Sequence, residues 1–256
     1  MTASTSGQAC GACRDGHGLD FPIAMAYQPI VEPARRSIVA YEALVRGPNG
    51  EPARSMLARV DDTNRYAFDQ TCRVKAIETF CLLGQGDSTA KLHVNFMPNA
   101  VYDPDTCIRT SLTAARRHGL PIERITFEMT ENERVTQHEH LRRIVATYRS
   151  LGFRTAIDDF GSGYAGLGLL VEFQPDKIKI DMTILRGIDA DPVRRAIVAG
   201  IVTTARELGI TLIAEGVETA AEFAVLSGLG IDRYQGFLFA RPAFQALATP
   251  DEITWP

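Results

Sequence analysis

The sequence has few cysteines, no long apolar run and no excess of basic residues, and each absence excludes a class of protein. Five cysteines in 256 residues form an odd and sparse set, which argues against a disulfide framework and is typical of a reducing compartment. Charged residues interrupt the apolar runs well short of the roughly 18 residues that a membrane span needs. The 27 Lys and Arg against 31 Asp and Glu give a net charge of -4, so we expect no duplex nucleic acid as a partner.

An apolar segment typical of a secretion signal is also missing from the first twenty residues. These residues are rich in Gly, Ser, Thr and Ala and lack hydrophobic periodicity, which predicts a flexible leader over 1–20 and a cytoplasmic location. Cys10, Cys13 and His17 supply at most three soft ligands, too few for a closed zinc site within one chain. Two interpretations stay open: incidental thiols in a disordered leader, or a redox- or metal-responsive tail completed across a dimer.

From Phe21 to the C-terminus, short β-branched or aromatic runs alternate with longer amphipathic segments. This alternation predicts the α/β class, with a parallel sheet covered by helices, in one domain over 21–256. Apolar residues recur at helical spacing over 141–151 and 197–208, where each helix is expected to have one core-facing stripe. The candidate strands are 25–31, 37–45, 91–96, 124–129, 153–158, 176–181, 211–215 and 231–237.

The length of the chain and the order of these segments match a TIM-like (β/α)8 barrel. The connection between the first two candidate strands departs from that pattern. It is the short segment EPARRS, over 32–37, which cannot hold the helix that a parallel crossover requires. We therefore expect an antiparallel pair at the first strand and an irregular start to the barrel.

Nearly every candidate strand carries a polar residue at or near its C-terminal end. A polar side chain in a β-branched run costs free energy unless it is paired or bound to a ligand. If the strands close into a barrel, these side chains converge on the C-terminal face, where barrel enzymes hold their active sites. A strand-end cap is the simpler interpretation of any single residue, but seven strands with the same feature favour a site. The residues are Glu42, Asn95, Glu128, Asp158, Asp159, Lys179, Asp181, Glu215, Glu218 and Gln235.

This candidate site is rich in oxygen ligands and contains neither His nor Cys, which suits Mg²⁺ or Mn²⁺ rather than zinc. Adjacent Asp158 and Asp159 can serve two ions if one carboxylate bridges them, as in in-line displacement at phosphorus. Lys179 is expected to orient the attacking water or to neutralise phosphate charge, and Glu215 is a candidate general base. The histidines at other positions lack a ligand partner at a convincing spacing and are interpreted as surface or strand-flanking residues: His93, His118, His138 and His140.

One further motif points to a different function. Residues 161–166 match the G-x-G-x-x-G pattern of a dinucleotide-binding turn, and Asp181 follows at the expected separation. The two acids directly before the glycines would oppose a pyrophosphate, and Gly168 and Pro175 interrupt the expected helix. A nicotinamide-dependent enzyme is therefore the less favoured interpretation.

A series of motifs extends from about Tyr27 to Pro242. The segments are YQPIV (27–31), YEALVR (41–46), HVNFMPN (93–99), FEMTEN (127–132), IDDFGSGYAGL (157–167), DKIKID (176–181), IAEGVET (213–219) and YQGFLFARP (234–242). This series resembles the EAL-domain family of cyclic-di-GMP phosphodiesterases, with the motifs in the family's order and at family-like separations. A single motif could not carry that resemblance.

The resemblance implies metal-dependent hydrolysis of one phosphodiester bond of cyclic-di-GMP, which gives the linear dinucleotide pGpG. It implies that one ion is held by Glu42, Asn95, Glu128 and Asp158, and the second by Asp158 and Asp159. Lys179 and Glu215 would position and deprotonate the water, and turnover would also require Glu42. Glu218, Asp181 and Gln235 would complete the metal and water shell. The substrate would be contacted by Gln28, Arg46, Asp181 and Gln235. Glu131 would brace the loop after Asp159.

The resemblance also implies two Mg²⁺ or Mn²⁺ ions as cofactors and a homodimer through the loop and helix after Asp159. Ca²⁺ is expected to inhibit, because it prefers more and longer ligand bonds than Mg²⁺. The chain departs from the family pattern at Gly47 and Pro48, where an aromatic residue is common, and at Ala165 and Gly166, which replace the usual serines. The second departure lies in the loop that is expected to support the dimer, so the dimer is less firmly implied than the chemistry.

Some members of this family have lost their acids and serve as receptors. A catalytically silent cyclic-di-GMP receptor that signals through the loop at 159–172 is therefore the alternative to the enzyme. Every position that the family uses for catalysis carries the expected residue type in this chain, which favours the enzyme.

Overall fold

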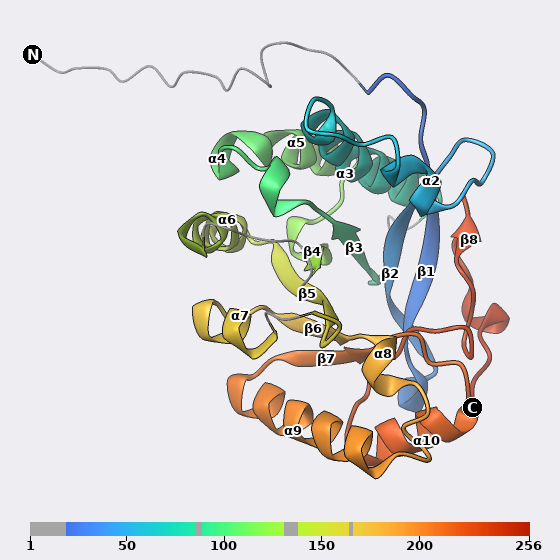
Figure 1. Ribbon diagram of the computed structural model, residues 1–256. Helices are drawn as coiled ribbons and strands as arrows, with labels where there is room; N and C mark the ends of the chain where they lie inside the picture. Colours follow the sequence, from blue (N-terminus) through green and yellow to red (C-terminus); the bar gives the residue numbers. More distant parts are fainter. Residues whose placement is uncertain (1–18, 85–88, 131–137, 164–165) are drawn as a thin grey trace, which may run out of the picture.

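The computed structural model describes residues 19–84, 89–130, 138–163 and 166–256 (Figure 1). The strands in this part are β1 (Ala24–Glu32), β2 (Ser37–Arg46), β3 (Lys91–Asn95), β4 (Ile125–Thr130), β5 (Arg154–Phe160), β6 (Lys177–Ile180), β7 (Thr211–Ala214) and β8 (Ala243–Phe244). The α-helices are α2 (Ala53–Leu57), α3 (Arg65–Leu82), α4 (Pro104–Cys107), α5 (Arg109–Arg117), α6 (His138–Ser150), α7 (Gly166–Glu172), α8 (Met182–Leu185), α9 (Pro192–Leu208) and α10 (Ala220–Gly228). Short 3₁₀ helices are η1 (Pro33–Arg35), η2 (Pro98–Ala100), η3 (Ile122–Arg124) and η4 (Pro250–Glu252).

The strands form one curled sheet with the order β7-β6-β5-β4-β3-β2-β1-β8, and helices lie outside it (Figure 1). Strands β2 to β7 pair in parallel, whereas β1 is antiparallel to both β2 and β8. The expected antiparallel start is therefore confirmed. A single 3₁₀ turn, η1, makes this connection, and Arg36 after it adopts a left-handed φ of 47° that reverses the chain.

Tyr234 closes the barrel by pairing with both β7 and β1. It forms a parallel bridge with Ala214 on β7 and an antiparallel bridge with Val31 on β1. The predicted strand over 231–237 is wrong in its extent, because only this one residue pairs, and β8 after it was not predicted. The segment runs parallel to β7 and antiparallel to β1. Tyr234 is the residue that pairs with both strands, and the chain then leaves the sheet. The α/β class and the TIM-like barrel with an irregular start are confirmed.

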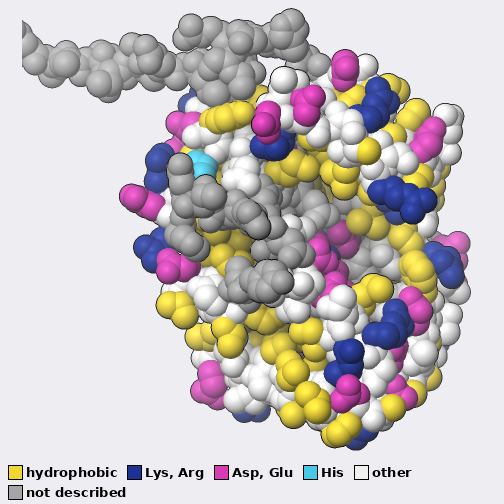
Figure 2. All heavy atoms as spheres, viewed as in Figure 1, with side chains coloured by type: hydrophobic (Ala, Val, Ile, Leu, Met, Phe, Trp, Pro, Cys, Tyr) yellow, Lys and Arg dark blue, Asp and Glu magenta, His cyan; other side chains and the backbone are white. Residues whose placement is uncertain are grey.

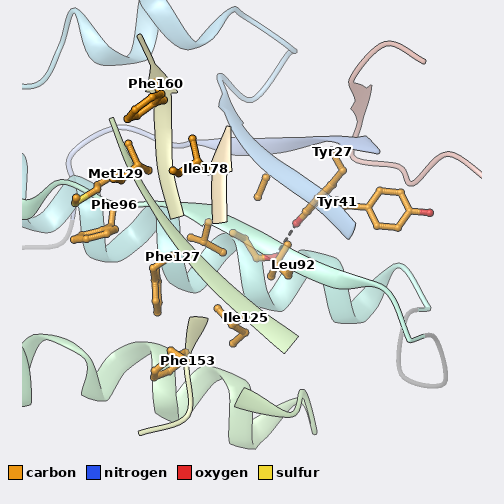
Figure 3. Close-up of a cluster of buried hydrophobic side chains, with 14 of the residues drawn as sticks. Tyr27, Tyr41, Leu92, Phe96, Ile125, Phe127, Met129, Phe153, Phe160 and Ile178 are labelled. Carbon is orange, nitrogen blue, oxygen red and sulfur yellow. Dashed lines mark hydrogen bonds between the residues drawn. The ribbon is translucent and has the colours of Figure 1, made fainter. Parts of the chain in front are cut away.

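Apolar side chains on the outer face of the barrel pack against the helices. Phe127 on β4 lies 5.0 Å from the Tyr148 ring of α6 and 5.1 Å from the Phe153 ring, measured between centroids. Figure 3 shows Phe127, Phe153 and neighbouring residues between the strands and the helices. The Tyr27 hydroxyl donates to the carbonyl of Ala76 at 2.8 Å and ties β1 to α3. Burial of these rings stabilises the outer layers and leaves the barrel interior to other residues.

Helices α6 and α9 confirm the two helices expected near 141–151 and 197–208. The expected apolar stripe is buried within α6, but Leu151 at its end lies beyond the helix and is 39% exposed. On α9, Ile197 and Leu208 are 49% and 45% exposed. Ala205, which belongs to the expected stripe, is buried, and so is Val198, which does not. Gly168 does not interrupt a helix, because α7 runs through it. Within the described residues no helix is long and apolar enough to cross a membrane.

Side chains alternate between the two faces of each strand, so every second residue points into the barrel. On β3 the inward positions hold Lys91, His93 and Asn95, and on β6 they hold Lys177 and Lys179. The outward positions between them are apolar and buried against the helices. The inward positions of β3 and β6 are therefore polar, and the barrel interior has an acidic end toward the C-terminal edge of the parallel strands and a basic end opposite.

Candidate active site

Lys179 lies at the centre of the acidic end. Its ammonium nitrogen, Nζ, is 3.0 Å from Glu42 Oε2, from Glu128 Oε2 and from Asp158 Oδ1, and 2.6 Å from Glu215 Oε1. The Lys179 side chain is fully buried, and it comes from β6 while the acids come from β2, β4, β5 and the end of β7. Lys179 and four of the predicted strand-end acids thus converge on one point.

Two side-chain amides and Lys179 fix the carboxylate of Glu42. Asn95 Nδ2 donates to Glu42 Oε1 at 2.9 Å, and Gln235 Nε2 donates to Glu42 Oε2 at 2.7 Å. Gln235 also lies 3.1 Å from Gln28 Oε1, which sits opposite Glu42 in the β1–β2 register. The Tyr234 closure therefore brings the Gln235 amide against Glu42, and Gln28 on the antiparallel strand β1 accepts from the same amide.

Asp158 and Asp159 occupy an irregular end of β5. The register between β5 and β6 shifts between Ile157 and Phe160, and Asp159 has a left-handed φ of 53°. The Asp159 amide donates to Asp158 Oδ1 at 3.0 Å. This local turn places both neighbouring carboxylates on the inner side of the strand, where strict alternation would have sent one of them outward.

The excess of acids disturbs their ionisation. Burial raises the pKa of Glu128 to about 7 and that of Asp158 to about 6, although Lys179 opposes both shifts. Burial and then Asp158 raise the pKa of Glu215 well above its ordinary value. At Glu42 burial acts in the same direction, but Lys179 and two amide donors outweigh it, so its pKa falls. A single buried cation is too little positive charge for this cluster.

The acids fit hard divalent cations. Oxygen atoms of Glu42, Glu128 and Asp158 lie within 4.8 Å of one another, as do oxygen atoms of Asp158, Asp159 and Glu215. Asp158 belongs to both groups, and all donors are carboxylates, joined at Glu42 by the amide of Asn95. Carboxylate and amide oxygens suit Mg²⁺ or Mn²⁺. Burial and neighbouring carboxylates raise the pKa values of Glu128, Asp158 and Glu215, and a divalent cation would oppose these shifts, so the residues fit the expected ions.

Several predicted site residues lie at the edge of this cluster. Asp181 caps α8 by accepting from the Thr183 amide at 2.8 Å, although its side chain also lines the cleft. The Glu218 side chain is 44% exposed and pairs with Arg186 at 2.9 Å.

Two further predicted residues are not placed in the cluster. The Arg46 guanidinium donates to the neighbouring carbonyl of Val45. Glu131 lies outside the described residues, as do Cys10, Cys13 and His17.

His93 is a correction to the sequence interpretation. It is not a surface residue: it is 1% exposed, and its Nδ1 contacts Glu128 Oε1 inside the barrel. Lys177 Nζ lies 3.0 Å from the other ring nitrogen, Nε2, so the imidazole hydrogen is on Nδ1 and is donated to Glu128. The alternation of Lys91, His93 and Asn95 on one strand could have revealed this placement, because Asn95 was already assigned to the inner face.

The acids form the floor of an open cleft of about 940 Å³. Glu42, Asp158, Asp159 and Glu215 line it, and Phe237 is an apolar, 47% exposed residue on its wall. Figure 2 shows a hollow on this face with acidic side chains inside it. The cleft can admit a ligand much larger than a metal ion, and it presents the carboxylates to that ligand.

Comparisons with known proteins identify the family. The EAL domain matches over residues 22–242. A standalone versatile EAL protein from Vibrio cholerae O395, in a c-di-GMP bound form, has 51% identity and a TM-score of 0.87, covering 93% of this chain and 98% of that chain. The calcium/c-di-GMP complex of Klebsiella pneumoniae BlrP1 has 37% identity and a TM-score of 0.83, covering 88% of this chain and 57% of that chain.

Curated relatives extend the comparison. The blue light- and temperature-regulated antirepressor BluF of Escherichia coli K12 is 30% identical over 90% of this chain and 56% of its own length. The cyclic di-GMP phosphodiesterase PdeR of the same organism is 41% identical over 46% of this chain and 18% of its own length. The chain thus spans about half or less of these curated relatives. The family match covers most of the chain, and the chain belongs to the EAL-domain family.

Proposed function

We propose that this chain hydrolyses one phosphodiester bond of c-di-GMP and releases linear pGpG. The observation that carries the proposal is the convergence of Lys179 with four carboxylates at the floor of the cleft. Binding of c-di-GMP by the Vibrio cholerae and Klebsiella pneumoniae proteins supports the choice of substrate.

Divalent Mg²⁺ or Mn²⁺ would supply the positive charge that lowers the pKa of a water molecule and stabilises charge on the phosphate. We assign one ion to Glu42, Asn95, Glu128 and Asp158, and a second to Asp158 and Asp159. The manganese complex of the Klebsiella pneumoniae protein supports this choice of metal. The Klebsiella pneumoniae protein also forms a complex with calcium and c-di-GMP. In this chain we expect Ca²⁺ to occupy the acidic cleft without supporting turnover.

The chain's own residues handle the water and the proton. Glu215 accepts the proton of the attacking water, and Lys179, 2.6 Å from Glu215, holds that carboxylate and favours its ionised form. The water oxygen forms a bond to phosphorus while the bond from phosphorus to the 3′ oxygen breaks. The released 3′ oxygen takes a proton from solvent, which balances the reaction and leaves a 5′ phosphate on pGpG.

Other residues are proposed to hold the substrate. Gln28 and Gln235 lie beside Glu42 at the cleft, and Asp181 lines its wall. Arg46 would have to turn from the Val45 carbonyl to reach the ligand, a rotation open to its half-buried side chain. The roles of Glu218 as part of the metal and water shell and of Glu131 as a brace for the loop after Asp159 also remain proposals.

A homodimer through the loop and helix after Asp159 is part of the proposal. Leu167 and Val171 on α7 are 64% and 80% exposed, which supports an apolar contact there. The division into a leader over 1–20 and one domain over 21–256, and the cytoplasmic location, also stay predictions.

A catalytically silent c-di-GMP receptor is the second candidate. The relative BluF, named as an antirepressor, is the observation that favours it. A receptor would bind c-di-GMP and release no pGpG, so calorimetry and product analysis on the same sample separate the two functions.

The test uses the purified full chain with Mn²⁺ or Mg²⁺ and chromatography of the products. We expect pGpG from the wild type, and a fall in kcat of roughly 100-fold or more in Glu215→Gln and in Glu42→Ala. Glu207→Gln, which alters an exposed acid on α9, is the matched control and should keep wild-type activity. Tight c-di-GMP binding without product would establish the receptor, and full activity in both site variants would overturn the assigned roles.

A further inference from the structure

A second cavity, of about 290 Å³, lies at the basic end of the barrel, opposite the acidic cleft. Lys91 and Lys177 are the first residues of β3 and β6, and Arg233 directly precedes the closing residue Tyr234. All three line this cavity. Strand alternation explains the placement, because Lys177 and Arg233 each lie two positions before a residue of the acidic end, and Lys91 lies four positions before Asn95.

The charges in this cavity are not balanced by the described residues. Within the described residues, no carboxylate oxygen lies within 4.0 Å of the side-chain nitrogens of Lys91, Lys177 or Arg233. Glu32 is the acid that lines the cavity, and it pairs with Arg35 at 2.9 Å. Three basic side chains thus share a small space, and none of them forms an ion pair with a described carboxylate.

Hydrogen bonding in the cavity is also incomplete. The Nε of Arg233 is buried and has no hydrogen-bond partner. Lys177, 5% exposed, donates to Thr126 Oγ1 at 2.6 Å and to His93 Nε2, which leaves one hydrogen of its ammonium group unused. Buried donors without acceptors cost free energy, and an acceptor inside the cavity would remove that cost.

Burial first, and repulsion between the basic side chains second, lower the pKa of both lysines in the cavity. Burial and then Lys91 lower the pKa of Lys177 to about 7. Burial and then Arg233 lower the pKa of Lys91. A negative ligand would relieve this repulsion.

Apolar side chains form part of the boundary between the cavity and the acids, and His93, which lines the cavity, contacts Glu128 across it. Ile30, Ala40 and Ile213 form a buried cluster inside the barrel and line the cavity. On the outer side the rim residues Arg35 and Thr89 are exposed, so the cavity is accessible from solvent. A ligand entering here would meet the cations without passing the acidic cleft.

We propose that this cavity binds a small oxyanion of the phosphate type, either free or as the phosphate group of a small ester. Lys91, Lys177 and Arg233 are the donors, and the planar guanidinium of Arg233 favours an oxyanion over a halide because it matches two oxygens at once. The site is independent of the proposed hydrolysis, since it shares no residue with the cleft.

The test is calorimetric titration of the metal-free full chain with inorganic phosphate at constant ionic strength. Removing divalent ions with EDTA prevents phosphate from binding to a metal in the acidic cleft. We expect one saturable phosphate site per chain, and an increase in Kd of about tenfold or more in Lys91→Gln and in Arg233→Gln, because each removes a charge-assisted hydrogen bond. Arg206→Gln, an exposed change on α9, is the control and should leave Kd unchanged.

A second titration, with methyl phosphate, separates the two sources of the ligand. Binding of both compounds indicates room for an ester, and binding of inorganic phosphate alone indicates the free ion. Crystals soaked in selenate should show anomalous scattering between Lys91, Lys177 and Arg233. The proposal is overturned if neither compound binds, or if both cavity variants, folded by circular dichroism, bind phosphate as tightly as the wild type.

Discussion

At the centre of the barrel one ammonium group faces four carboxylates, and no other cation of the described residues pairs with those acids. Desolvated carboxylates are costly unless a positive charge lies close by. Lys179 therefore has a structural role whether or not the site turns over a substrate. This role can be tested separately from catalysis.

We expect Lys179→Met to lower the free energy of unfolding by about 3 kcal/mol or more in EDTA, because removing one partner leaves buried charges uncompensated. Mn²⁺ should restore part of the loss by supplying positive charge to the same acids. Urea unfolding near neutral pH measures both effects. Lys75→Met on the exposed face of α3 is the control, and an equal, small loss in both variants would contradict the role.

Lys177 predicts a pH dependence of the opposite end of the barrel. Burial, then Lys91, lowers its pKa from 10.5 to about 7 in the folded chain. Between about pH 7 and pH 10.5, Lys177 binds a proton in the unfolded chain but not in the folded chain. The free energy of unfolding therefore rises with pH across this range and falls as the pH drops toward 7. Relative to Lys177→Met, the wild type should gain about 2 kcal/mol between roughly pH 7 and pH 9.

Urea unfolding of both proteins across this pH range, in buffers free of phosphate and sulfate, gives the difference directly. Those anions are left out because binding in the basic cavity would hold Lys177 in its charged form. A difference between the two proteins that does not change with pH would show that Lys177 keeps its ordinary pKa.

At the scale of elements, the segment after Tyr234 determines how the barrel closes. A Cβ atom on Gly236 would lie 2.1 Å from the carbonyl oxygen of Val217, closer than atoms can approach. Only glycine lets this segment lie against the chain after β7, where the Val217 amide donates to the Gln235 carbonyl at 3.1 Å. The closure in turn positions the Gln235 side chain on Glu42.

We expect Gly236→Ala to destabilise the fold by about 2 kcal/mol or more, because the clash is with backbone atoms that cannot rotate away. Gly200→Ala is the matched control: no atom lies within 4 Å of its Cβ position in the middle of α9, so the change should stabilise by about 0.5–1 kcal/mol. Thermal and urea unfolding of both variants test this contrast. Similar stabilities for the two variants would argue against the tight closure.

On the scale of the whole molecule, the barrel interior is divided into an acidic and a basic end. The net charge of -4 does not reveal this division. Divalent ions at the acidic end would reduce the repulsion there and should bind only the folded chain, since the acids come from separate strands.

Mn²⁺, Mg²⁺ and Ca²⁺ should each raise the unfolding midpoint above its value in EDTA. At an ion concentration of roughly 100 times Kd, the expected gain in the free energy of unfolding is about 2.7 kcal/mol. Only Mn²⁺ and Mg²⁺ should support hydrolysis. Differential scanning calorimetry and product analysis measure the two effects on the same sample. An unfolding midpoint that is the same in EDTA and in all three metals would contradict a metal site in the cleft.

Fold class, family membership and the set of acids and amides at the strand ends could all be predicted from the sequence. These depend on local periodicity and on motif spacing, which a linear chain displays. The antiparallel start was also predictable, because six residues cannot make a parallel crossover. The position of Glu42, Asn95, Glu128 and Lys179 at or near the C-terminal ends of their strands predicted that they lie at one face of the barrel.

Tertiary structure alone decided which of these residues meet and how charged groups are balanced. Spacing along the chain does not give the distance from Lys179 to four acids on other strands, nor the burial of His93 between Lys177 and Glu128. Closure through Tyr234 and the basic cavity likewise arise from segments far apart in sequence. The physical reason is that burial and Coulomb interaction depend on positions in space, which only the closed barrel fixes.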